Sequence, residues 1–234
     1  MRPAIPQPCL CLVTDRRVGD GQTLVSRVAE AVAGGVDLVQ LREKDLPGGR
    51  LLELASSLKE AIGPSALLVI NERLDVAVAS GAAGVQLGEE ALPVAAARQI
   101  LGSEPLIGRS VHSVAGAAQA FDQGADFLVV GTMYATRSHP GTQIAGPDLV
   151  RRIARDCPIP LIGIGGINAD NVGEVLCAGA AGVAVITSIL ASPRPGEAAR
   201  DLKQAMLAAW QANPPLSPFT KGDNGGFRGG PNRR

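Results

Sequence analysis

Short apolar runs alternate with glycine-rich or polar loops and helical segments along most of this chain, and that alternation limits the possible folds more than any other feature. Continuous apolar runs of this length are typical of parallel strands that are buried on both faces. The segments between them have helical periodicity, and each closes on glycine. The apolar runs cover residues 9–13, 36–41, 66–70, 83–87, 105–108, 126–131, 160–165 and 182–186, and helical examples are 24–33, 50–62, 93–101, 115–123 and 168–178.

Eight strands that alternate with helices in a chain of 234 residues predict an α/β protein with a single (β/α)8 barrel of the TIM type. An open doubly wound sheet is the alternative, but no GxGxxG motif follows the first strand. We assign residues 1–212 to the barrel domain. Residues 213–234 are rich in proline, glycine and basic residues and lose all periodicity, which predicts a disordered tail.

Composition excludes several classes of protein. The chain is 46% hydrophobic, and 22 Lys and Arg residues balance 22 Asp and Glu residues. It therefore lacks the charge excess of a disordered chain and the basic excess of a nucleic-acid binder. It contains no apolar run that would span a bilayer and no signal peptide. The four cysteines form no CxxC pair, which favours buried thiols over zinc. We expect a cytoplasmic protein without nucleic-acid or membrane partners.

The loops after the seventh and eighth predicted strands carry the clearest chemical signal. Gly165 and Gly166 follow the seventh strand, and Ile186 and Thr187 lead from the eighth strand into a short helix. Glycine turns and helix amino termini expose N–H groups that favour anions, and these loops are the usual phosphate seat of such barrels. We expect these four residues to bind a phosphorylated small molecule. The alternative is that the glycines only permit tight turns.

Other strand ends add polar candidates. Period-two alternation places Gln40, Arg42 and Lys44 on one side of the second strand, so that two cations converge. His112 follows the fifth strand, where capping of the next helix by Ser113 is an alternative explanation of the turn. His139 lies in a polar loop after the sixth strand, and it is the stronger candidate for an acid or base.

Six motifs in chain order resemble the thiamin phosphate synthase family, which includes the TenI-like thiazole tautomerases. They are LVTD at 12–15, VQLREK at 39–44, INER at 70–73, GVQLG at 84–88, IGGI at 164–167 and GVAVI at 182–186. The resemblance extends from about Cys9 to Trp210, and it implies a (β/α)8 barrel and a thiazole phosphate ligand.

The resemblance also implies residue roles, with some departures. Synthases of the family hold Mg²⁺ through two Asp residues, and diphosphate through cations at Arg42, Lys44 and a lysine in the loop after the sixth strand. Gln40 and Asn71 match as well, and Glu72 stands at the first metal position. Ala91 replaces the second metal Asp, however, and His139 replaces the loop lysine. Alanine cannot ligate a metal, and histidine is mostly neutral near pH 7.

These departures, together with a stretch at 107–113 that looks closer to the tautomerase branch, favour a metal-free thiazole tautomerase. Its acid/base would be His139, and Gln40, Arg42 and Lys44 would orient the substrate carboxylate. The other expected substrate-binding residues are Asn71, Ser110, Thr136 and Ser138.

Two alternatives remain open. One is a Mg²⁺-dependent synthase that couples hydroxymethylpyrimidine diphosphate to the thiazole phosphate and releases pyrophosphate, with Glu72 as a metal ligand. The other is a regulator that binds thiazole phosphate without turnover. In each case the expected partner is a small phosphorylated thiazole, and a homodimer is the candidate assembly.

Overall fold

The computed structural model describes residues 2–19, 23–135 and 144–212. Its strands are β1 (Cys9–Val13), β2 (Leu38–Leu41), β3 (Leu67–Asn71), β4 (Gly84–Leu87), β5 (Leu106–Val111), β6 (Phe127–Gly131), β7 (Leu161–Ile164) and β8 (Gly182–Val185). They pair in parallel in chain order, and β8 pairs with β1 to close a barrel. The predicted (β/α)8 barrel is confirmed, and the predicted tail at 213–234 lies outside the described residues.

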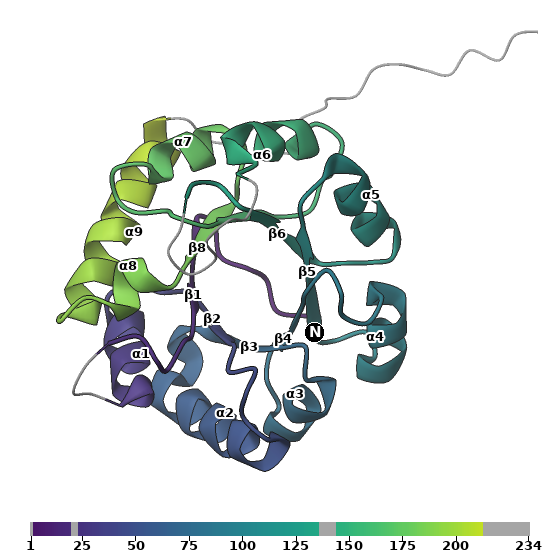
Figure 1. Ribbon diagram of the computed structural model, residues 1–234, viewed down its shortest axis with the longest axis vertical. Helices are drawn as coiled ribbons and strands as arrows, with labels where there is room; N and C mark the ends of the chain where they lie inside the picture. The colour runs from purple at the N-terminus through teal and green to yellow at the C-terminus, as the bar shows by residue number, and fades with distance from the viewer. Residues whose placement is uncertain (1, 20–22, 136–143, 213–234) are drawn as a thin grey trace, which may run out of the picture.

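Helices surround the barrel as a ring (Figure 1). They are α1 (Leu24–Ala33), α2 (Gly48–Ile62), α3 (Leu74–Ser80), α4 (Val94–Leu101), α5 (Val114–Asp122), α6 (Gly146–Ala154), α7 (Val172–Cys177), α8 (Thr187–Leu190) and α9 (Pro195–Ala212), with a 3-10 turn at Gly63–Ser65. No helix in the described part of the chain is both long enough and apolar enough to cross a membrane.

One helix starts later than its sequence pattern predicts. The pattern places a helix over 168–178, whereas α7 begins at Val172. The side-chain oxygen of Asn168 accepts the N–H groups of Asp170 and Asn171, at 2.9 and 3.2 Å. This local turn competes with the helix for the same donors, so the chain forms a loop after β7 before it becomes helical.

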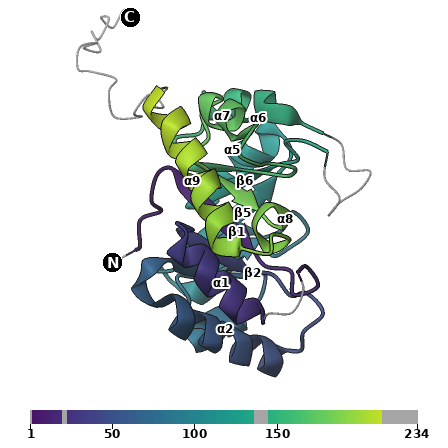
Figure 2. The same cartoon turned by 90° about the vertical axis from the view of Figure 1, so that its left-hand side faces the viewer.

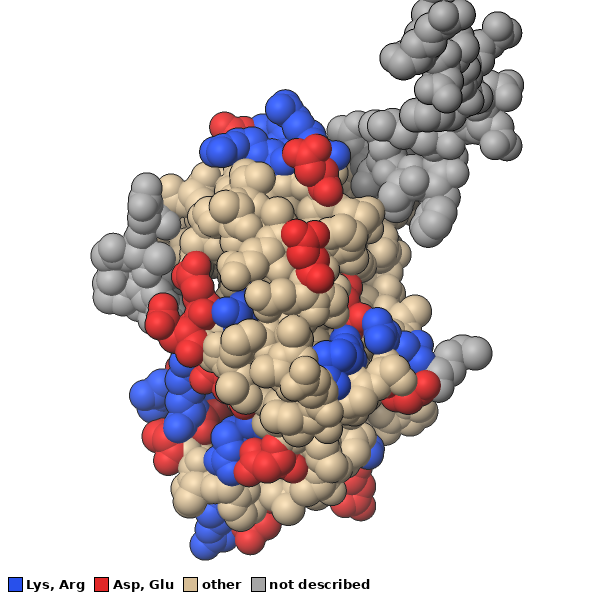
Figure 3. Space-filling model, turned by 90° about the vertical axis from the view of Figure 1, so that its right-hand side faces the viewer, with Lys and Arg blue, Asp and Glu red and all other residues tan. Residues whose placement is uncertain are grey.

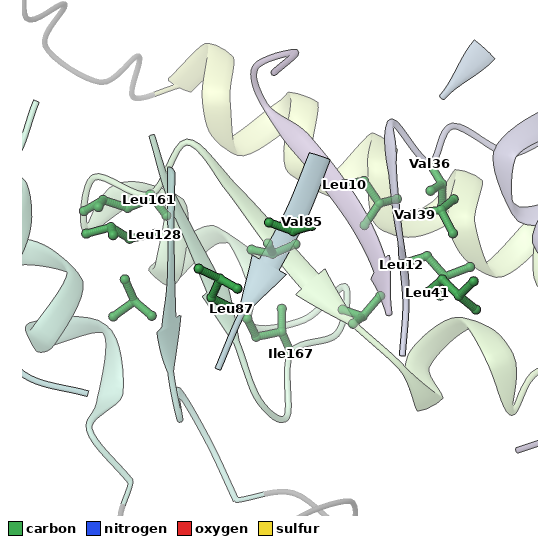
Figure 4. Close-up of a cluster of buried hydrophobic side chains, with 14 of the residues drawn as sticks. Leu10, Leu12, Val36, Val39, Leu41, Val85, Leu87, Leu128, Leu161 and Ile167 are labelled. Atoms are coloured by element: carbon green, nitrogen blue, oxygen red, sulfur yellow. The ribbon is translucent and has the colours of Figure 1, made fainter. Parts of the chain in front are cut away.

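Strand side chains alternate between two cores, as the pleat of a strand requires. Outward-facing residues such as Leu10, Val39 and Val85 pack with the helices in the larger core (Figure 4). Inward-facing residues, among them Cys11 and Phe127, fill the barrel. Apolar side chains fill the interior of the barrel toward the amino ends of the strands. The polar groups that face inward therefore lie at the carboxyl end of the barrel.

The amino-terminal segment covers the opposite end of the barrel (Figure 2). Ile5 packs against the inner core, and Arg2 donates to Asp126 and to the carbonyl of Ser103. Asp126 also accepts the N–H of Ile107 at 2.7 Å and the guanidinium of Arg98 at 2.6 Å. One buried carboxylate therefore ties β5, α4 and the amino terminus to the base of the barrel.

We predict that Asp126→Ala lowers the free energy of unfolding by about 2 kcal/mol, because the partly buried guanidinium of Arg98 and the buried N–H of Ile107 lose their acceptor. Urea denaturation measures this loss. Asp148→Ala is the matched control, since the Asp148 carboxylate is 84% exposed and pairs with Arg151 on the same helix. It should leave stability unchanged. Equal effects of the two substitutions would contradict the structural role of Asp126.

Candidate active site

Polar side chains occupy the last inward-facing layer of β2 to β5, at the carboxyl end of the barrel. Gln40 donates its amide to Asn71 at 2.9 Å, and Gln86 donates its amide to Ser110 at 3.1 Å. Gln40 and Gln86 are buried, with 6% and 1% of their surface exposed. Three residues predicted from the sequence therefore lie in the same layer of the structure: Gln40, Asn71 and Ser110. We call this set of four residues the amide layer.

Gln86 is the member that the sequence analysis did not select. Its side-chain oxygen is buried and has no hydrogen-bond partner among the described residues, while its amide nitrogen also approaches the carbonyl of Leu87 at 3.3 Å. Alternation along β4 was the available signal, because it places Gln86 on the inward face, as it does Gln40 on β2. A buried acceptor without a partner costs free energy, so a ligand that donates a hydrogen bond would be stabilised there.

Gly108 makes room for this amide. A Cβ atom at Gly108 would lie 2.1 Å from the side-chain oxygen of Gln86 and 2.2 Å from the Cζ atom of Phe127. Both distances are far below van der Waals contact. Glycine is therefore needed where the amide layer meets the apolar filling of the barrel.

Two cations follow β2 at the mouth of the barrel. The backbone N–H of Arg42 donates to the hydroxyl of Thr14 at 2.9 Å, which joins the ends of β1 and β2. The ammonium of Lys44 lies 3.7 Å from the carboxylate of Glu72, and the two side chains are 55% and 35% exposed. The contact is long and partly solvated, so Lys44 can exchange it for a more strongly charged anion.

Glu72 follows β3 in a left-handed backbone conformation, with φ of 61°. A Cβ atom at Gly88 would lie 2.4 Å from its carboxylate, so Glu72 extends over the end of β4. Ala91 lies in the turn after β4, where its N–H donates to the carbonyl of Gly88 at 3.1 Å. Within the described ranges, no three His, Cys, Asp or Glu side chains group closely enough to hold a metal.

The loops after β7 and β8 lie side by side. The hydroxyl of Ser188, in α8, donates to the carbonyl of Ile167 at 2.5 Å. Gly165 and Gly166 have φ values of 107° and 65°, which glycine adopts without strain. The first N–H groups of a helix have no acceptor within it, and in α8 these groups belong to Thr187 and Ser188. The four predicted phosphate-binding residues thus lie on two adjoining loops.

The segment after β6 is attached to the same loops. Tyr134 donates its N–H to the carbonyl of Gly165 at 3.0 Å and its hydroxyl to the carboxylate of Glu174 at 2.8 Å. Burial and the neighbouring carboxylate raise the pKa of Tyr134 to about 12. The predicted site residues Thr136, Ser138 and His139 lie outside the described residues, so their roles stay predictions.

His112 lies beside this segment on the rim. Its Nδ1 atom is 2.8 Å from the carbonyl of Gly131, so Nδ1 must carry a proton, and Nε2 lies 3.7 Å from the carboxylate of Glu89. Ser113 caps α5 by accepting the N–H of Gly116 at 3.0 Å. The turn at His112 therefore has the capping function that the sequence offered as its alternative explanation.

A hollow of about 630 Å³ lies outside the barrel, between α3 and α4. Most of its lining is apolar, and its seven residues are Glu72, Leu74, Asp75, Val78, Ala79, Leu92 and Ile100. Figure 3 shows the side of the molecule that carries α4 and α5, where uncharged side chains occupy much of the centre. The hollow lacks the converging hydrogen-bond donors of the barrel mouth, which is therefore the better candidate for chemistry.

Comparisons with known proteins identify the family to which this chain is similar. The family model described as thiamine monophosphate synthase matches residues 10–189. The thiamine-phosphate synthase of Methanoculleus marisnigri is 43% identical over 205 residues, which cover 86% of this chain and 96% of that protein. The thiamine-phosphate synthase of Haloarcula marismortui is 44% identical over 200 residues, covering 83% and 95%.

A solved structure extends the comparison to the fold. The thiamine phosphate pyrophosphorylase of Pyrococcus furiosus superposes with a TM-score of 0.79 and 34% sequence identity, over 86% of this chain and 96% of that one. These relatives are named for the synthase reaction. The comparisons therefore favour the synthase, which the sequence analysis held as its alternative, over the tautomerase that it preferred.

We predict that Gly108→Ala lowers the free energy of unfolding by about 1–3 kcal/mol, because the new methyl group overlaps Gln86 and Phe127. Chemical denaturation measures the change. Gly49→Ala in α2 is the control, since nothing lies within 4 Å of the added atom, and it should leave stability unchanged or slightly raised. If Gly108→Ala were as stable as this control, the amide of Gln86 would not be fixed as described.

Proposed function

The chain belongs to the thiamine monophosphate synthase family, and we propose that it joins a hydroxymethylpyrimidine diphosphate to a thiazole phosphate and releases pyrophosphate. One observation carries the proposal: the barrel mouth has two separate places for anions. Arg42 and Lys44 follow β2, whereas the glycine turn at Gly165–Gly166 follows β7 and lies beside α8 through the Ser188–Ile167 hydrogen bond. In the barrel order β1 separates these places. A reaction between two phosphorylated substrates needs both of them.

The proposed reaction forms one bond and breaks one. The thiazole nitrogen uses its lone pair to form a C–N bond to the methylene carbon of the pyrimidine. The C–O bond to the diphosphate breaks, and its electron pair leaves with pyrophosphate. Negative charge therefore grows on the leaving group, where fixed cations at Arg42 and Lys44 would lower the barrier.

The amide layer suits the pyrimidine. Ring nitrogens of a pyrimidine accept hydrogen bonds, and the amides of Gln40, Asn71 and Gln86 carry donors as well as acceptors. Gln86 also has a buried oxygen that no described residue contacts through a hydrogen bond, and this oxygen can accept one from a substituent of the ring. We propose that this layer orients the pyrimidine so that its methylene carbon faces the thiazole.

The family implies Mg²⁺, and the donor set at the mouth fits a weakly held ion. Mg²⁺ is usually bound by one or two carboxylates together with substrate phosphate oxygens. Glu72 supplies one exposed carboxylate near Lys44, and Ala91 supplies none. Glu72 would hold the ion only together with the diphosphate, and the ion would neutralise part of the leaving group's charge when bound.

The test is a coupled assay for pyrophosphate, with both substrates and Mg²⁺ present. We expect product formation by the unmodified chain and a roughly hundredfold loss of kcat/KM in Lys44→Met, since a cation on the leaving group is removed. Lys59→Met is the control, because the Lys59 ammonium donates to carbonyls at the end of α3, away from the mouth. Absence of pyrophosphate from the unmodified chain at saturating substrate would reject the proposal.

The second anion place gives an independent prediction. Ser188→Ala should raise the KM for the thiazole phosphate several-fold and leave the KM for the diphosphate unchanged, because it releases α8 from the carbonyl of Ile167. Steady-state kinetics with each substrate varied in turn measures both constants. Ser57→Ala, which removes a hydroxyl bonded to a carbonyl within α2, should change neither. Equal rises in both KM values for Ser188→Ala would contradict selective binding of the thiazole phosphate beside α8.

A further inference from the structure

Glu43 lies between the two cations of the β2 end, yet it points away from them. Its carboxylate is buried, with 2% of the side chain exposed. One oxygen accepts the backbone N–H of Arg16 at 3.1 Å, and the other accepts the Arg16 guanidinium at 3.0 Å. Arg16 belongs to the loop after β1, so this contact joins the loops after β1 and β2.

Arg16 also binds Asp45, two residues after Glu43. Its guanidinium donates to both oxygens of the Asp45 carboxylate, at 2.7 and 2.6 Å. These hydrogen bonds hold the pKa of Asp45 down at about 2. A third tie lies on the other side of Glu43, where the N–H of Arg42 donates to Thr14. Contacts at Arg42, Glu43 and Asp45 thus attach the segment that carries Arg42 and Lys44 to the loop after β1.

We propose that Glu43, locked by Arg16, is a positioning residue for the diphosphate group. Alternation at a strand end turns Glu43 one way and its neighbours Arg42 and Lys44 the other way. Because Arg16 occupies both carboxylate oxygens, Glu43 does not compete for Arg42 or Lys44, whose charges stay available to an anion. This inference rests on the proposed function, since it assigns Glu43 a part in binding the leaving group.

Three possible roles of Glu43 predict different effects of Glu43→Gln on pyrophosphate binding. If Glu43 acted only as a nearby negative charge, Glu43→Gln would tighten pyrophosphate binding, because a charge that repels the anion is gone. If it acted only in folding, the melting temperature would fall while the folded protein bound pyrophosphate as before. Positioning predicts weaker binding by the folded protein, on the roughly tenfold to hundredfold scale that a misplacement of about 1 Å produces.

Isothermal titration calorimetry with inorganic pyrophosphate, at a fixed magnesium concentration, separates these roles. The titrations are run on the full chain, well below the melting temperature of each variant. We expect Glu43→Gln to bind pyrophosphate at least tenfold more weakly, and its KM for the diphosphate substrate should rise while the KM for the thiazole phosphate stays constant. Glu53→Gln is the control, because the Glu53 carboxylate is exposed and pairs with Arg50 on α2, away from the barrel mouth.

Arg16→Lys serves as the second variant, and it keeps the inference testable if Glu43→Gln does not fold. Lysine keeps the charge but lacks the planar fork that reaches two carboxylates, so we expect a similar but smaller loss of affinity. Unchanged or tighter binding of pyrophosphate by the folded variants would overturn the positioning role. Failure of the unmodified chain to bind pyrophosphate would instead count against the proposed function, so the two outcomes are distinguishable.

Discussion

The pairing of β8 with β1 is the constraint on which the rest of this structure depends. Cys9 to Leu12 lie in register with Gly182 to Val185, and parallel pairing carries the same direction around the whole barrel. Every strand therefore ends at the same rim, so short loops from distant parts of the sequence meet there. Lys44 and Glu72 come into contact at the rim although neither strand encodes a binding site by itself.

Closure also separates the two places that we propose for anions. The chain has no net charge, with 22 basic and 22 acidic residues, so attraction for phosphate must come from local arrangement. Side-chain cations follow β2, whereas the neutral N–H groups belong to the loops after β7 and β8. A diphosphate that gains charge during reaction is best matched by cations, and a phosphate that is only held can be matched by dipoles.

Much of this architecture could be predicted from the sequence, because it follows from periodicity. Apolar runs predicted the strands, and alternation predicted that Gln40 lies with Arg42 and Lys44 on one side of β2. Side-chain pairing is not periodic, so neither the pairing of Glu43 with Arg16 nor the partnerless oxygen of Gln86 could be read from the pattern. The sequence analysis preferred a tautomerase, which the comparisons do not favour, for a related reason. The preference rested on two positions, Ala91 in place of a metal-binding Asp and His139 in place of a lysine. A reaction depends on the whole set of contacts in the site.

Unsatisfied groups are unevenly distributed between the two ends of the barrel. At the base, Asp37 accepts the N–H of Leu10 and the ammonium of Lys203, and Asp126 is fully engaged as well. At the mouth, the described residues leave the buried acceptor of Gln86 without a donor, which costs roughly 1–3 kcal/mol, and Glu72 adopts a left-handed conformation. A ligand that donates to Gln86 removes part of this cost, so binding and folding stability are coupled at this end of the barrel.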